Sequence, residues 1–299
     1  MRFLVLGTVM IDEAMAVAEF PVPGATVIAG PARRDLGGKG ANQAIVLHRA
    51  GADVRLVAPI GQDAEAEWVV QALLRSGIDV ADLLPLDQPT DRSLIFVGPG
   101  GENAIASIVE AAESFDAAMA RESVGGIGPG DMLVMQGNMT LAATAAAMAA
   151  ARSQGALTLL NPSPVRPGAE RLFPLSDCLI VNEGEALQFA GCADPAEAAK
   201  RLLAAGAGTV VVTLGSRGAL AASAGDIARV SALPVEPVDS TGAGDTFAAV
   251  FAAARYGRGL PLTESLEAAG RAAAITVSRP GTQAAFPSRD ELAAILPPR

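Results

Sequence analysis

A glycine-rich segment in the C-terminal part of the chain carries an aspartate that could act as a general base. In VDSTGAGDTFAA (residues 238–249), Gly242, Ala243 and Gly244 directly precede an apolar run typical of a helix. Small residues at a helix N-terminus leave backbone N–H groups accessible to an anion, which the helix dipole also attracts. Asp245 would lie in the first turn, where its carboxylate could accept a proton from an attacking hydroxyl. A glycine-rich turn followed by a stabilising first-turn acid explains the same residues equally well.

A second glycine-rich segment, LGGKGANQA, occupies residues 36–44. It matches neither the phosphate loop GxxxxGK[ST] nor the dinucleotide fingerprint GxGxxG. What it offers is an exposed backbone with one cation, Lys39, and one amide, Asn42, which suits a polyhydroxylated ligand. Taken alone, this segment is a weak signal.

Composition limits the classes of protein to which the chain can belong. The 299 residues are 51% hydrophobic and 18% charged, which excludes disorder and allows one large α/β domain or two modest ones. The net charge of −10 disfavours binding to nucleic acid or to an anionic membrane. A single histidine, His48, excludes histidine-rich zinc sites. The two cysteines, Cys178 and Cys192, lack metal-site spacing and indicate a reducing cytoplasm, and we expect both to be core residues.

Two apolar stretches could be mistaken for targeting or membrane segments. The N-terminus MRFLVLGTVMIDEAMA imitates a signal peptide, but Asp12 and Glu13 favour a buried strand over residues 3–9 that ends in a polar loop. The apolar stretch 132–151 is interrupted by Gln136, Gly137 and Asn138, so it is not a membrane span.

The elements that must position the two glycine-rich segments follow an α/β pattern. From about residue 130, short β-rich runs alternate with Ala/Leu-rich helical segments, which predicts a parallel sheet with helices on both faces. Residues 13–35 are punctuated by Pro and Gly, and 93–110 reads as two strands around Pro99, Gly100 and Gly101. We expect these segments to form a small sheet that acts as a lid over the carboxyl ends of the parallel strands, where ligands bind.

Together, the two segments resemble the paired signatures of the ribokinase-like carbohydrate kinases, also called the phosphofructokinase-B family, and most closely the ribokinases. The resemblance covers nearly the whole chain. It also includes GTVMID (7–12), LNPSP (160–164), VNEGEA (181–186), TLGSRGA (213–219) and RPGTQAAFP (279–287). It implies one kinase domain over residues 1–299, with a three-layer fold built on a mostly parallel central sheet and a small β-sheet lid.

The resemblance also implies a role for individual residues. Asp245 matches the catalytic base, and Gly242, Ala243 and Gly244 match the anion hole for the transferring phosphoryl group. Residues that match the sugar site are Asp12, Gly38, Lys39, Gly40, Ala41 and Asn42. Asn182 and Glu185 match an NxxE motif that organises the ATP phosphates and Mg²⁺, although an ordinary helix start explains them too. Matches to the nucleotide-binding strand end and turn are Thr213, Gly215, Ser216, Arg217 and Gly218, which could also form a plain hairpin turn.

A monovalent cation site, expected to hold K⁺, is implied by five further matches. These are the Asp239 side chain and the backbone oxygens of Thr241, Thr276, Arg279 and Gly281. Ala285 stands where some relatives have a serine, which predicts a weaker site. NPSP is expected to shape the cleft without taking part in the chemistry.

Two sugar-reading positions depart from the ribokinase pattern. Met10 stands where ribokinases usually have Asn, and Asn138 stands where they have Glu. Gly270 replaces the adenine-side histidine of some ribokinases. These departures predict an altered sugar pocket beside intact catalytic machinery.

The sequence therefore predicts a cytoplasmic, ATP- and Mg²⁺-dependent kinase that phosphorylates a hydroxyl, expected to be a primary one, of a small sugar. Two alternatives stay open: a nucleoside kinase of the same fold, and a catalytically silent sugar- or nucleotide-binding regulator. Exposed strand edges on the lid favour a homodimer formed through it.

Overall fold

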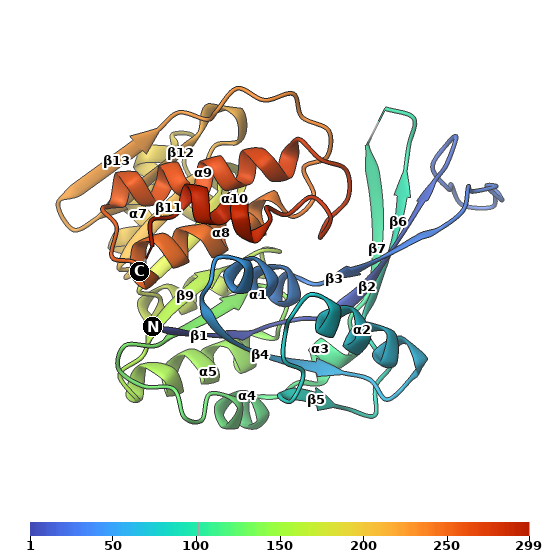
Figure 1. Ribbon diagram of the computed structural model, residues 1–299, viewed down its shortest axis with the longest axis horizontal. Coiled ribbons are helices and arrows are strands. Elements are labelled where there is room, and N and C mark those ends of the chain that lie inside the picture. The colour runs from blue at the N-terminus through green and yellow to red at the C-terminus, as the bar shows by residue number, and fades with distance from the viewer. Residues whose placement is uncertain (101, 299) are drawn as a thin grey trace.

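The computed structural model describes every residue except Gly101 and Arg299. Nine of the described strands form a large sheet in the order β13-β12-β11-β10-β9-β8-β1-β4-β5 (Figure 1). Neighbours from β5 to β11 are parallel, whereas β12 and β13 are antiparallel additions at one edge. The strands are β1 (Arg2–Leu6), β4 (Asp53–Ile60), β5 (Leu83–Pro85), β8 (Met132–Gln136), β9 (Leu157–Asn161), β10 (Cys178–Asn182), β11 (Thr209–Thr213), β12 (Ala219–Ser223) and β13 (Asp226–Val230).

Helices cover both faces of this sheet, as the sequence pattern predicts. Alternation along β1 shows why both faces need cover: Phe3 and Val5 join one hydrophobic core, while Leu4 and Leu6 join the other. The first core includes residues from α1 (Lys39–Arg49), α2 (Ala64–Arg75), α8 (Ala243–Ala252), α9 (Leu262–Val277) and α10 (Arg289–Ile295). The second includes residues from α3 (Glu110–Ser114), α4 (Ala117–Ser123), α5 (Leu141–Ser153), α6 (Glu183–Ala190) and α7 (Pro195–Ala204).

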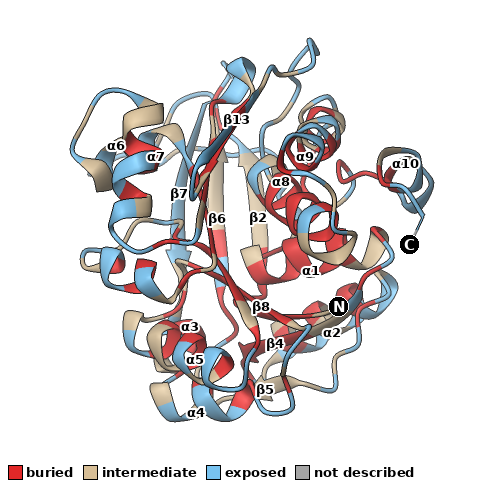
Figure 2. Cartoon of the chain, turned by 90° about the vertical axis from the view of Figure 1, so that its left-hand side faces the viewer, coloured by how far each residue is buried: buried red, intermediate tan, exposed pale blue. Residues whose placement is uncertain are grey.

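A second, four-stranded sheet projects from the main body (Figure 1). Its order is β3 (Arg33–Gly37), β2 (Met10–Ala16), β6 (Arg92–Val97) and β7 (Asn103–Ile108). The β6–β7 hairpin confirms the two strands expected around Pro99 and Gly100, although Gly101 lies outside the described residues. Figure 2 shows exposed residues along β7, at one edge of this sheet.

The N-terminal prediction needs correction in two places. The first strand ends at Leu6 rather than Val9, because the chain turns toward α1: the Thr8 carbonyl accepts from the Ala41 N–H at 3.1 Å. Asp12 and Glu13 lie inside β2, not in a polar loop, since β2 pairs with β3 on one side and with β6 on the other. The small sheet therefore begins at Met10, before the residue 13 expected for the lid.

Asp91 anchors the base of the β6–β7 hairpin. Its buried carboxylate accepts from the N–H groups of Ala111 at 2.9 Å and Ala112 at 3.3 Å, beyond the end of β7. Its backbone carbonyl accepts from the Ile11 N–H in β2 at 3.1 Å. Burial raises the pKa of Asp91 to about 6. One residue thus ties both ends of the hairpin to the neighbouring strand.

Within the described part of the chain, every helix is too short or too polar to cross a membrane. Cys178 is fully buried and Cys192 only partly so, and both are free thiols. The prediction that both cysteines are core residues holds fully only for Cys178.

Candidate active site

The two glycine-rich segments meet in space, because α1 packs against α8. Asn42 and Asp245, which are 203 positions apart, are joined by a 2.9 Å hydrogen bond. Gly242 precedes α8 with φ of 76°, and a Cβ there would lie 2.6 Å from Cε1 of Phe286. Only glycine tolerates both the conformation and the close approach. The fold therefore places the predicted anion loop (residues 242–244) and the predicted sugar loop (residues 38–42) side by side.

Asp245 lies in the first turn of α8, as predicted, and is only 4% exposed. Asn42 Nδ2 donates to its Oδ2 at 2.9 Å, and Gln43 Nε2 donates to its Oδ1 at 3.0 Å. The ammonium of Lys39 lies 3.6 Å from Oδ1. These donors stabilise a buried carboxylate, which is the form of the group that can accept a proton.

The sugar loop reaches this position by turning tightly at the start of α1. Gly38 has φ of 92°, and a Cβ there would lie 2.5 Å from the carbonyl oxygen of Thr8. Lys39 then begins the helix, and Gly40, Ala41 and Asn42 form its first turn, all buried. The loop residues expected to contact sugar are thus packed against the chain that connects β1 to β2.

A cavity of about 400 Å³ lies between the small sheet and the loop that precedes α8. Of the residues predicted to be functional, Asp12, Asp239 and Thr241 line it, whereas Asp245 does not. Arg33 and Asp35 also line it and pair with each other at 2.7 Å. The sequence analysis missed both, because charged residues on a strand edge give no local signal of a cavity.

Asp12 lies opposite Asp35 in the β2–β3 pairing. Burial, and then the negative charges of Asp35 and Asp245, raise the pKa of Asp12 to about 6. Its carboxylate is therefore ionised at neutral pH and protonated in mild acid.

If Asp12 accepts hydrogen bonds from a sugar, the KM for that sugar should rise as the pH falls through 6, because the protonated acid loses acceptor capacity. Initial rates over a range of sugar concentrations, from about pH 5 to about pH 8, measure this dependence. Asp12→Asn, which does not titrate, should show a high and nearly pH-independent KM. A constant wild-type KM over this range would contradict the role of Asp12.

Met10 and Asn138, the two departures from the ribokinase pattern, are held by their neighbours. Met10 is 6% exposed, with the Ser93 hydroxyl 3.5 Å from its sulfur. Asn138 has a buried Oδ1 for which no described residue provides a partner. Arg166 donates to the backbone oxygens of Gly137 at 2.9 Å and of Asn138 at 2.8 Å. Arg166, which lies just after the NPSP turn, is a further residue that the sequence analysis missed.

The residues matched to nucleotide binding lie at neighbouring strand ends. Asn182 ends β10 and pairs with Thr213, which ends β11. Asn182 and Glu185 form a capping box at the start of α6, with both hydrogen bonds at 2.9 Å. Gly215, Ser216 and Arg217 form a short 3₁₀ turn before Gly218, and the turn connects antiparallel β11 to β12. The helix start and the hairpin turn are thus real local structures, and a nucleotide role stays a prediction.

The residues matched to the cation site lie on two adjacent loops, except Thr276, which lies in the last turn of α9 just before the second loop. Asp239 accepts from the Thr241 N–H at 2.9 Å and from the Gly281 N–H at 3.0 Å. Burial alone would raise the pKa of Asp239, but these hydrogen bonds and the charge of Arg33 lower it. The Thr276 carbonyl accepts from the Arg279 N–H at 3.2 Å.

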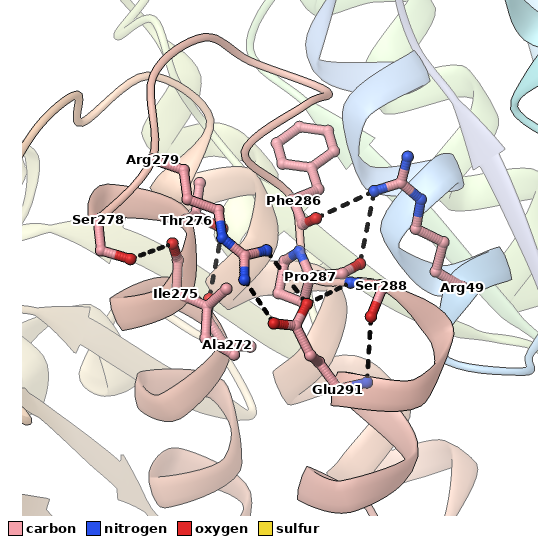
Figure 3. Close-up of polar contacts among 10 residues, drawn as sticks. All are labelled: Arg49, Ala272, Ile275, Thr276, Ser278, Arg279, Phe286, Pro287, Ser288 and Glu291. Atoms are coloured by element: carbon pink, nitrogen blue, oxygen red, sulfur yellow. Dashed lines mark hydrogen bonds and ion pairs between the residues drawn. The ribbon is translucent and has the colours of Figure 1, made fainter.

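The second of these loops is anchored by side chains shown in Figure 3. The Arg279 guanidinium donates to Glu291 at 3.1 Å and, together with hydrogen bonds from Ser288, lowers the pKa of Glu291 to about 2. Arg49 in α1 donates to the Phe286 carbonyl at 3.1 Å. These contacts fix the loop against α1 and α10.

Comparison of the sequence and the structure with those of known proteins identifies relatives of this chain. The family model described as pfkB family carbohydrate kinase matches residues 2–289. The chain belongs to the pfkB family of carbohydrate kinases. It is 34% identical to a ribokinase of Schizosaccharomyces pombe over 303 aligned positions, covering 96% of this chain and 95% of the relative. A ribokinase structure from Thermotoga maritima superposes with a TM-score of 0.89 at 27% identity, covering 98% of each chain.

The family places this pfkB chain among ATP-dependent sugar kinases. The chain is 28% identical to a bifunctional ribokinase/ribose-5-phosphate isomerase A of Fructilactobacillus sanfranciscensis. The match covers 99% of this chain but only 56% of that relative's length.

Proposed function

We propose that this protein transfers the γ-phosphate of ATP to a hydroxyl of a small, furanose-sized sugar. The observation that carries this proposal is the buried Asp245, which lies beside the anion loop and is hydrogen-bonded to Asn42 of the sugar loop. The ribokinases among the relatives support a pentose-like acceptor.

Asp245 would accept the hydroxyl proton as the sugar oxygen attacks the γ-phosphate. The N–H groups at the start of α8 would hold the phosphoryl oxygens; Gly244 has open space beside it, as an approaching phosphate requires. Asp12, Lys39 and Asn42 would orient the sugar. The small sheet, which supplies Asp12 and borders the cavity that Asp12 lines, would cover the bound sugar from solvent.

The donors at α6 are compatible with a nucleotide-bound Mg²⁺. Mg²⁺ in kinases keeps several waters and takes one or two carboxylates together with substrate phosphates, so a dense cluster of acids is not required. Glu185 could supply one such carboxylate, since its capping box uses Oε2. The ion would neutralise charge on the phosphates during transfer.

The proposal is tested by measuring the ADP formed from ATP in the presence of each of about thirty sugars and nucleosides. We expect turnover with at least one small sugar and little with nucleosides. Turnover with nucleosides alone would favour the nucleoside kinase. Binding of a sugar or nucleotide without any turnover would favour the silent regulator.

K⁺ should activate the enzyme through the loops that carry Asp239 and Gly281. A site made of several carbonyl oxygens and one carboxylate suits a large hard cation, and the lowered pKa keeps Asp239 charged. Rates in potassium, sodium and a bulky ammonium salt, at equal ionic strength, measure the effect. Asp239→Asn should weaken the response to potassium, whereas equal wild-type rates in all three salts would contradict the site.

We also propose a homodimer formed through the small sheet. The edge strand β7 is exposed along most of its length, and Ile105 within it is 57% exposed.

A single kinase domain over residues 1–299 is supported by the family match to residues 2–289. A cytoplasmic location stays a prediction.

A further inference from the structure

A chain of buried amides extends from Asp245 into the protein interior. Gln43 Nε2 donates to Asp245 Oδ1 at 3.0 Å, and Gln136 Nε2 donates to Gln43 Oε1 at 2.9 Å. Gln43 and Gln136 have no exposed surface, and they come from different elements, α1 and the end of β8. No family motif quoted above assigns a role to either glutamine.

The direction of every hydrogen bond in this chain is fixed by Asp245. An ionised carboxylate only accepts, so Gln43 must present its NH₂ group to Asp245 and its oxygen to Gln136. Gln136 must then donate in turn. Hydrogen bonds aligned in this way polarise one another, which strengthens the bond that reaches the carboxylate.

Asn42 and Gln43 are adjacent in the sequence but differ in what they can do. The Asn42 amide donates to Asp245, while its buried Oδ1 is one of the atoms that lack a partner among the described residues. Asn42 can therefore engage a ligand hydroxyl. Gln43 has both of its amide atoms engaged within the protein and is fully buried. Gln43 can therefore keep its hydrogen bond to Asp245 when Asn42 forms a hydrogen bond with a ligand.

We propose that Gln43 and Gln136 are positioning residues that fix the carboxylate of Asp245 in the orientation required for proton transfer. Gln43 acts directly on Asp245, and Gln136 acts only by orienting Gln43. This inference rests on the proposed function, in which Asp245 is the base. Beyond that function, it assigns Gln43 and Gln136, which do not touch substrate, the role of orienting the base.

The test compares Gln43→Met, Gln136→Met and the double variant, since methionine keeps the length and volume of glutamine without its hydrogen bonds. Loss of a bond to a charged group should lower the kcat of Gln43→Met roughly 10- to 100-fold, with the KM for ATP unchanged. Loss of the neutral amide bond should lower the kcat of Gln136→Met roughly 2- to 10-fold. The double variant should be no slower than Gln43→Met, because Gln136 acts through Gln43.

A control for the substitution type is Gln154→Met, an exposed glutamine that follows α5 and bonds to the backbone carbonyls of Val124 and Ala150. This control should keep the wild-type kcat. Thermal unfolding of each variant separates positioning from loss of fold. Wild-type kcat in a folded Gln43→Met would overturn the proposal. So would a double variant whose loss is the full product of the two single losses.

Crystal structures of the wild type and Gln43→Met provide a readout that does not depend on turnover. We expect the Asp245 side chain to leave its wild-type rotamer or to occupy more than one. An unmoved, singly ordered Asp245 would overturn the positioning role. If the wild type phosphorylates no sugar, the proposed function fails, and the crystal structures still decide whether Gln43 positions Asp245.

Discussion

Replacing Asp245 with asparagine should reduce turnover about 10²- to 10⁴-fold while leaving ATP binding nearly intact. The amide keeps the shape of the carboxylate but cannot accept the hydroxyl proton. Single-turnover rates and calorimetric ATP titrations of the variant measure the two quantities separately.

The surroundings of Asp245 indicate that this variant keeps its fold. An asparagine at 245 can direct its oxygen toward Gln43 Nε2, so the hydrogen bonds made by Gln43 and Gln136 can be kept. Its NH₂ group then faces Asn42, and Asn42 can flip so that its unpartnered Oδ1 accepts the bond. A loss of turnover would therefore report on chemistry rather than on unfolding. Retention of more than half of the wild-type turnover would show that Asp245 is not the base.

The parts of the site that could be predicted from sequence are those carried by short, local patterns. The predicted anion loop rests on Gly242, Ala243 and Gly244 beside an apolar helix; in the structure α8 begins at Ala243, and Asp245 lies in its first turn as predicted. The alternation of strand and helix likewise predicts the parallel sheet and its covered faces. Such features depend on residues that are neighbours in the chain.

The parts that could not be predicted depend on contacts between distant residues. Gln136 and Gln43 are 93 positions apart, and Gln43 and Asp245 are 202 apart, so no window of sequence contains the amide chain. The mixed pairing of β2 is also non-local, since it requires β6. Local patterns can moreover fit two functions at once. Asn182 and Glu185 form a capping box whether or not they also contact a nucleotide.

D-Ribose should be a poor substrate, with a catalytic efficiency roughly a hundredfold below that of the preferred sugar. A hydroxyl desolvated against Met10 without a partner costs about 1 to 3 kcal/mol, and an amide in place of a charged acceptor at Asn138 costs a similar amount. The Ser93 hydroxyl beside Met10 is already paired with Ser107 at 2.8 Å, which limits its ability to compensate. The preferred substrate should carry fewer hydroxyls or an apolar group at this point, as a deoxy sugar does; a preference for a nucleoside-like compound would instead favour the nucleoside kinase.

The double replacement Met10→Asn with Asn138→Glu should raise the efficiency on ribose relative to the preferred sugar. The new carboxylate would lie on the segment to which Arg166 already donates, but Arg166 also pairs with Glu113 at 2.5 Å, so the cation offsets only part of the cost of burying a second carboxylate. Steady-state kinetics on ribose, a deoxypentose and the preferred sugar, for wild type, both single variants and the double variant, measure the change. Met139→Leu, a swap within the buried core next to Asn138, is the control and should leave the ratio between sugars unchanged. Wild-type efficiency on ribose that equals or exceeds every other compound would refute the prediction, since the pocket would then supply the missing hydrogen bonds by another route.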